Sequence, residues 1–145
     1  MTVQRILDSQ QGVERTYVTP DAIIRDVLNS LAFRNVGALV VSTDGDKVEG
    51  IISERDIVRG LQKAGADLLD QPVREVMTEK VVTCVATDRA AGIMAVMVSK
   101  HLRHVPVVED GRFVSMISIR DLLQLRLTEV QSEADAMRNY IAGGP

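Results

Sequence analysis

The chain has 145 residues, of which 46% are apolar and only 3% aromatic, so it can bury an aliphatic core as one compact unit or two small ones. A formal net charge of -3 argues against a nucleic-acid surface, and no apolar run reaches membrane-spanning length. Residues 1–8 lack the apolar segment of a signal peptide, and a single cysteine, Cys84, excludes an internal disulfide. We therefore expect a cytoplasmic protein that binds neither nucleic acid nor membrane, with Cys84 as a small buried side chain.

Short patterns recur in the same order in the two halves of the chain. Residues 3–7 and 73–77 share a Val-x-x-aliphatic pattern typical of a helical turn, and residues 16–21 and 83–88 each predict a short strand followed by a helix start. Strands are then expected at 36–41 and 104–108, each followed by an Asp-Gly turn, at 44–47 and 109–112. The pairing makes the first turn two residues longer than the second.

Between these strands each half carries an amphipathic helix. The first is expected to bury side chains with the i, i+3, i+4, i+7 spacing of one helical face, namely Ile24, Val27, Leu28 and Leu31. The second is expected to bury the residues in the same phase, namely Ala91, Met94, Ala95 and Val98.

The strongest repeated element is Ser-x-Arg-Asp, at Ser53–Asp56 and Ser118–Asp121, where a buried strand ends and a helix begins. A Ser followed three residues later by an acid is a capping-box signature. The free N–H groups at the start of a helix and its dipole favour an anion such as phosphate. The alternative is that both elements are only caps, although capping does not require the Arg that both copies keep.

These repeats predict an α+β fold made of two α-β-α-β-β-α units. We place the first repeat at residues 1–65, the second at 66–126 and a helical extension at 127–145, with a linker over residues 62–72 that contains Gly65, Asp67 and Pro72. The linker is too short for a separate domain, so the two repeats are expected to pack on each other with pseudo-two-fold symmetry.

The last segment predicts one long helix, since residues 120–141 contain neither Gly nor Pro, and Gly143-Gly144-Pro145 is expected to end it. Its apolar residues have the alternating spacing of a coiled-coil seam: Leu123, Leu127, Val130, Ala134, Met137 and Ile141. At about 1.5 Å per residue the helix is roughly 33 Å long, too long for one repeat. We expect its far half to pack on another chain or along the partner repeat; the alternative is a free tail.

The repeat resembles the CBS domain, the module named after cystathionine β-synthase. The resemblance rests on aliphatic-aliphatic-Ser-x-x-Asp in both halves, on residues 103–108 (Arg-His-Val-Pro-Val-Val) and on residues 73–78 (Val-x-x-x-Met-Thr). It implies a pair of repeats that often dimerises, with two clefts that bind adenosine-containing ligands such as AMP, ADP, ATP, NAD or S-adenosylmethionine. It also implies a regulatory module rather than an enzyme.

The resemblance also implies which residues bind the ligand. In the first cleft these are Thr16, Val36, Gly37, Ala38, Ser118, Arg120 and Asp121, and in the second they are Thr83, Val105, Pro106, Ser53, Arg55 and Asp56. Met116 is also expected at a ligand, and Arg103 and His104 occupy positions where relatives hold phosphate. Asp at this position suits both ribose hydroxyls and would repel a 2′-phosphate, which disfavours NADP. We align Asn35, Val36 and Gly37 of the first repeat with Leu102, Arg103 and His104 of the second. The first repeat therefore lacks the basic pair, and the two clefts are expected to differ in affinity or in ligand.

The favoured function is a sensor of adenine nucleotides that acts on a separate partner protein. The alternative is an interaction and oligomerisation scaffold with empty clefts, in which the helical tail matters most. The histidines, His101 and His104, and Cys84 form neither a Ser–His–acid or Cys–His arrangement nor a metal-ligand spacing. We therefore predict no enzymatic activity, no catalytic cofactor, no metal and a homodimer or higher homo-oligomer.

Overall fold

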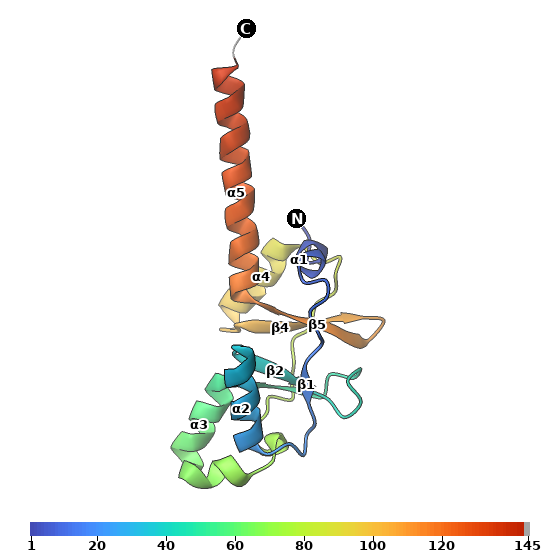
Figure 1. The fold of residues 1–145 in the computed structure, drawn as a ribbon, viewed down its shortest axis with the longest axis vertical. Coiled ribbons are helices and arrows are strands. Elements are labelled where there is room, and N and C mark those ends of the chain that lie inside the picture. The colour runs from blue at the N-terminus through green and yellow to red at the C-terminus, as the bar shows by residue number, and fades with distance from the viewer. Residues whose placement is uncertain (144–145) are drawn as a thin grey trace.

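The computed structural model describes residues 1–143 and contains two small sheets, one in each half of the chain (Figure 1). In the first sheet, β1 (Tyr17–Val18) runs parallel to β2 (Ala38–Val41), which pairs antiparallel with β3 (Gly50–Ser53). The second sheet is the antiparallel hairpin of β4 (His104–Glu109) and β5 (Arg112–Ser118). The predicted α+β fold of two similar halves is confirmed.

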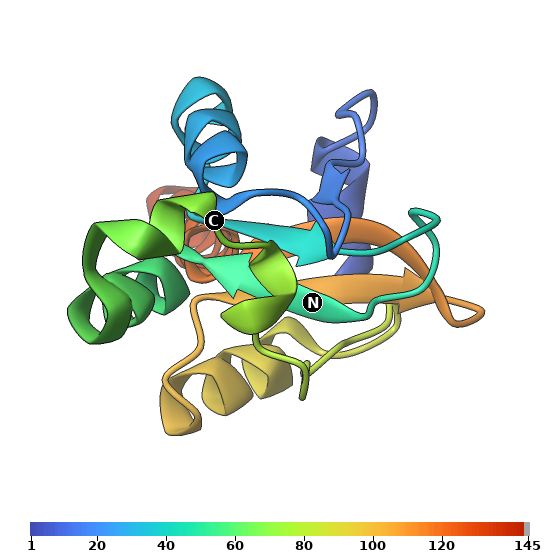
Figure 2. The ribbon, with the colours of Figure 1, turned by 90° about the horizontal axis from the view of Figure 1, so that it is seen from below.

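Helices cover both sheets and connect their strands. In chain order they are α1 (Gln4–Ser9), α2 (Ile24–Arg34), α3 (Glu54–Ala64), the 3₁₀ helices η1 (Gly65–Asp70) and η2 (Val73–Glu75), α4 (Ala90–Ser99) and α5 (Ile119–Ala142). Seen along the long axis of the molecule, the strands of the two halves overlie one another, with α2 on one side and α4 on the other (Figure 2). This arrangement brings the first turns of α3 and α5 to the region between the halves.

The two halves exchange their leading segments. Val3 and Ile6 of the α1 region belong to the core of the second half, where the Val3 N–H donates to the Asp88 carbonyl at 2.9 Å. Val73 at η2 belongs to the core of the first half, where its N–H donates to the Ala22 carbonyl at 2.8 Å. The exchange links the halves through both cores. The repeat boundaries at residues 65 and 126 stay predictions.

Two predicted elements of the second half are shorter than expected. Residues 73–77 were expected to repeat the turn at residues 3–7, which lies in α1, but they form only the three-residue η2. The strand expected from Thr83 is reduced to a single parallel bridge between Cys84 and Val107. Pro72, directly before η2, has no backbone N–H to donate. Beside Cys84 a single bridge to Val107 already provides the backbone hydrogen bonds, so a longer strand is not required.

The expected pairing of the two halves was wrong by one residue before the hairpin turns. The Glu54 N–H donates to the Gly37 carbonyl and the Ile119 N–H to the Arg103 carbonyl, at 3.0 and 2.9 Å, so Gly37 corresponds to Arg103. Ala38 therefore corresponds to His104, and the first turn is longer by one residue rather than two.

The same slip explains the error in the buried face of α4. The buried side chains are Ala90 and Met97, with Ile93 and Met94 packed against the core. Of the predicted set, only Met94 belongs to this face, whereas Ala91, Ala95 and Val98 are exposed. The corresponding face of α2 was predicted correctly: Ile24, Val27 and Leu31 are buried and Leu28 packs on the core. Because α4 is apolar on nearly every side, its sequence does not determine its phase.

The predicted long C-terminal helix is confirmed as α5, which ends at Ala142 with Gly143 at its C-cap. The expected terminators Gly144 and Pro145 lie outside the described residues. Its first turns pack through Leu122 and Leu125 on the core of the second half. Beyond them the helix projects from the body of the molecule (Figure 1). It therefore does not lie along the partner repeat, which was one of the two expectations for it.

Candidate functional site

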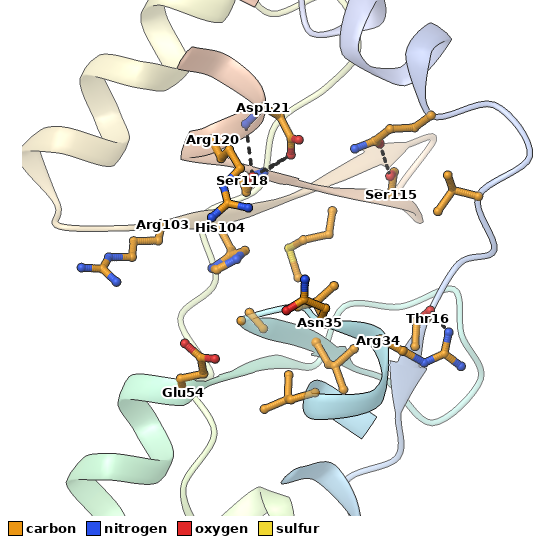
Figure 3. A pocket seen from close by; sticks show the side chains of 18 of the residues that line it. Thr16, Arg34, Asn35, Glu54, Arg103, His104, Ser115, Ser118, Arg120 and Asp121 are labelled. Atoms are coloured by element: carbon orange, nitrogen blue, oxygen red, sulfur yellow. Dashed lines mark hydrogen bonds between the residues drawn. The ribbon is translucent and has the colours of Figure 1, made fainter. Parts of the chain in front are cut away.

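A cleft of about 1070 Å³ lies between the two halves of the molecule and is lined by both of them (Figure 3). Its volume lies just above the usual range for small-molecule sites, roughly 300–1,000 Å³. Ten of the predicted binding residues line it: Thr16, Val36, Gly37, Ala38, Arg103, His104, Met116, Ser118, Arg120 and Asp121. Since residues far apart in sequence meet there, a ligand in the cleft would contact both halves.

The wall from the second half is built on the start of α5. Ser118 caps the helix, with its backbone N–H and hydroxyl donating to Asp121 Oδ2 at 2.7 and 2.8 Å. The Ser118 hydroxyl oxygen in turn accepts from the Asp121 N–H at 3.2 Å. Among the described residues no hydrogen bond reaches Asp121 Oδ1. The capping box thus fixes the carboxylate and leaves Oδ1 without a hydrogen bond within the described residues.

The facing wall is the chain between α2 and β2. Helix α2 ends at Asn35 in the left-handed conformation (φ 53°), and the backbone of Val36, Gly37 and Ala38 then enters β2. A Cβ atom on Gly37 would lie 3.1 Å from His104 Cε1 and 3.5 Å from Glu54 Oε2. The absence of a side chain at Gly37 therefore lets His104 and Glu54 approach the backbone closely.

His104 is a half-buried imidazole that crosses from the second half toward the first. Burial lowers the pKa of His104 below its ordinary value of 6.5, the Glu54 and Asp121 carboxylates act in the opposite direction, and Arg103 adds to the lowering. A phosphate placed beside this ring would favour its protonated form. The ring can therefore accept a proton when an anion enters.

Three arginines line the cleft, and sequence reasoning found two of them. Arg103 and Arg120 come from the second half, as predicted. Arg34, in the last turn of α2, was missed; its Nη1 donates to Thr16 Oγ1 at 2.9 Å, as Figure 3 shows. Arg34 could have been noticed as a basic residue in the last turn of a predicted helix. Cations are common in such turns because they interact favourably with the helix dipole, so this position alone does not indicate a binding site.

Three further polar residues of the cleft were also missed. Glu54 lines the cleft because it follows Ser53 directly at the start of α3. Gln10 and Ser115, from α1's C-terminal side and β5, are joined by a hydrogen bond of 2.7 Å from Ser115 Oγ to Gln10 Oε1. No sequence spacing connects Gln10 with Ser115, because the contact depends on the exchange of α1 to the second half.

The six residues assigned to a second cleft do not line this one. They are Ser53, Arg55, Asp56, Thr83, Val105 and Pro106. Ser53 and Asp56 form the same capping box as Ser118 and Asp121, which confirms that part of the pattern. However, Asp56 Oδ1 accepts from Thr78 Oγ1 at 3.1 Å, and Arg55 Nη1 donates to the His101 carbonyl at 3.0 Å. Both groups are thus engaged within the protein, and the second cleft stays a prediction.

Other expectations concern metals and membranes. Within residues 1–143, no three His, Cys, Asp or Glu side chains gather as a metal site would require. Helices in the same range are either too short or too polar to cross a bilayer. Cys84 is a buried member of the second core, and burial, with a smaller effect of Asp88, raises its pKa to about 11.

The fold agrees with comparisons to known proteins. Residues 14–63 and 73–128 both match the CBS domain, so the chain belongs to the CBS domain family as a tandem pair. It is 33% identical over 132 residues to the mitochondrial CBS domain-containing protein CBSX3 of Arabidopsis thaliana. That alignment covers 88% of this chain and 64% of the relative, so the chain spans less than two thirds of that protein's length.

Solved structures of the family superimpose on most of the chain. A CBS-domain containing protein from Agrobacterium tumefaciens is 37% identical, with a TM-score of 0.82 over 87% of this chain and 99% of that one. A CBS domain protein from Pyrobaculum aerophilum, solved in complex with AMP, is 28% identical, with a TM-score of 0.69 over 83% of this chain and 89% of that one. The fold assigned from the sequence is therefore that of the family.

Proposed function

We propose that this protein is a regulatory module that binds an adenosine nucleotide in the cleft between its halves and transmits occupancy to a separate protein. One observation carries the proposal: Asp121 lines a cleft between the halves, and its carboxylate, fixed by the capping box, keeps one oxygen without a hydrogen bond among the described residues. A carboxylate held in this way can accept hydrogen bonds from ribose hydroxyls. The Pyrobaculum aerophilum relative in complex with AMP supports the choice of ligand class.

The distribution of charge in the cleft supports an anionic end of the ligand beside the second half. Arg103, Arg120 and the first N–H groups of α5 belong to this wall, and arginine forms strong paired hydrogen bonds with phosphate. His104 adds a donor that gains strength when it is protonated. Asp121 on the same wall would repel a 2′-phosphate, so NAD is expected to bind more tightly than NADP.

The opposite wall suits an uncharged base. It is formed by the backbone of residues 36–38 and by Leu28, Leu31 and Leu39, whose apolar atoms can contact the faces of an adenine ring. Backbone N–H and C=O groups near the start of β2 can read the base edge. We therefore place the base against the first half and the phosphate against the second.

Binding across the cleft would couple the halves. They are already tied by the Arg55–His101 bond and by Arg15, whose Nη1 donates to the Phe113 carbonyl at 2.7 Å. A ligand adds a further connection and stabilises whichever relative arrangement it fits best. A partner protein could then recognise the arrangement of the two halves that the ligand stabilises.

A melting screen with AMP, ADP, ATP, NAD and S-adenosylmethionine tests the proposal. Ligand at about 100 times Kd should stabilise the protein by about 2.7 kcal/mol, which raises the melting temperature by several degrees. Inorganic phosphate and NADP serve as controls, and both should shift the melting temperature less than AMP and NAD. An unchanged melting temperature with all five adenosine ligands would contradict the proposal and favour a scaffold that binds no nucleotide.

A further inference from the structure

The far part of α5 has no counterpart to pack against within the described chain. Leu125 is the last residue of this helix that contacts either hydrophobic core in the part that the structure describes, residues 1–143. The following residues, 126–142, extend the helix by roughly 25 Å at about 1.5 Å per residue. Figure 1 shows this part projecting away from both sheets. Most helical stability in proteins comes from packing an apolar face, and within the described residues this part packs on neither core.

An apolar row follows the projecting part along one face. Leu127, Val130, Met137 and Ile141 are 66%, 47%, 67% and 74% exposed, and Ala134 completes the row. Their alternating spacing of three and four residues is the a/d pattern of a coiled coil. In this register Leu127, Ala134 and Ile141 take a positions and Val130 and Met137 take d positions. Leu123, half exposed at the base, continues the row to the body.

The charges beside this row identify the partner. Glu133 falls at a g position and Arg138 at the e position five residues later, which is the pairing that joins two parallel helices. In the alternative antiparallel alignment, in which Val130 faces Ala134, Glu133 would lie near Glu133 of the other helix. Among residues 1–143 Arg138 forms one ion pair, with Asp135 of its own helix at 3.7 Å, and its side chain is 77% exposed, so it can turn to another chain. The row is therefore complementary to itself in the parallel orientation.

We propose that α5 pairs with α5 of a second copy of this chain in a parallel coiled coil over residues 123–141. The seam buries Leu127, Val130, Met137 and Ile141, and Glu133 of each chain pairs with Arg138 of the other. The parallel orientation places both bodies at the same end of the coiled coil, so the two nucleotide clefts are related by its two-fold axis. The proposal stands independently of what the clefts bind.

Light scattering after size-exclusion chromatography tests the seam. The wild-type chain of 15.9 kDa should elute with twice that mass, and Met137→Asp should shift it toward the monomer because a seam position is desolvated on pairing. Asn139→Asp adds the same charge two residues away at an outward position and should leave the mass unchanged. A wild-type monomer at high concentration, or a Met137→Asp dimer as tight as the wild type, would overturn the proposal.

Charge exchange tests the parallel orientation. Glu133→Arg and Arg138→Glu each place like charges together twice in the dimer and should weaken it roughly five- to tenfold, while the double variant should recover the wild-type dissociation constant. Both positions are exposed, so circular dichroism should show an unchanged fold in all three variants. If the single variants dimerise like the wild type, or the double variant is the weakest, the parallel pairing is wrong.

Discussion

Replacing Asp121 with Ala should separate the role of this carboxylate in binding from its role in folding. The substitution removes the acceptor of the Ser118 N–H and hydroxyl bonds, at 2.7 and 2.8 Å, which should lower the free energy of unfolding by about 1 kcal/mol. It also removes the acceptor for the ribose. Two hydrogen bonds to a charged group are worth about 3 kcal/mol or more, so the Kd for AMP should rise roughly 100-fold.

The second copy of the motif provides the matched control. Asp56→Ala deletes the same capping box, with bonds of 2.9 Å from the Ser53 N–H and hydroxyl, and also the Thr78 bond at 3.1 Å. It should therefore cost at least as much stability as Asp121→Ala while leaving the affinity of the cleft intact. Calorimetric titration with AMP and urea unfolding of both variants give the two quantities. Equal Kd values for wild type and Asp121→Ala, or equal losses in the two variants, would refute the ribose role.

Three further predictions concern titration, thiol reactivity and packing. His104 has a lowered pKa in the folded protein, so as the pH drops below 6.5 its imidazole is protonated more readily in the unfolded chain, and the free energy of unfolding should fall. Urea unfolding should show a smaller fall in this free energy for His104→Gln, and the same pH dependence in both proteins would contradict the prediction. Cys84, buried and with a pKa of about 11, should react with a thiol reagent slowly when folded and rapidly in denaturant; fast labelling of the native protein would argue against a core position. Ile117→Ala in the second core should cost about 2–5 kcal/mol by chemical denaturation, whereas a loss below 1 kcal/mol would show that the core collapses to fill the space.

The sequence predicted those elements whose signals are local. The capping boxes at Ser53 and Ser118 depend on residues three apart, and both form as expected. The Asp-Gly turn of the second hairpin and the amphipathic face of α2 are also local patterns, and each is present. Ten of the sixteen site residues that the CBS resemblance implies line one cleft.

Errors arose where the local signal was weak. An apolar helix such as α4 has no polar face to fix its phase, so a one-residue slip between the halves went undetected and moved its buried face from Met97 to Val98. The αL residues that end α2 and α4, Asn35 and His101, mark the correct alignment. Neither is Gly, so this signal was not evident from residue type.

The exchange of α1 and η2 between the halves could not be read from sequence order. Sequence patterns show that residues 3–7 and 73–77 are similar, but not which core each segment joins. That choice depends on the geometry of the intervening segments and on bonds such as Val3 N–H to Asp88 carbonyl, which join residues distant in sequence. The Gln10–Ser115 contact at the cleft follows from the same exchange, which is why it was missed.

The two Ser-x-Arg-Asp copies illustrate how a duplicated motif acquires different chemistry. Each copy builds the same helix start, since the capping box is satisfied within four residues. The remaining capacity of the side chains depends on neighbours outside the motif: Thr78 occupies Oδ1 of Asp56 and the His101 carbonyl holds Arg55, whereas Asp121 Oδ1 and the Arg120 side chain have no such bond among residues 1–143. Thr78→Val should therefore free Asp56 Oδ1. If calorimetry then shows an additional AMP site, the Thr78 hydroxyl accounts for the difference in ligand binding between the two copies of the motif. If the number of AMP sites is the same in Thr78→Val as in the wild type, freeing Asp56 Oδ1 is not sufficient to create a site.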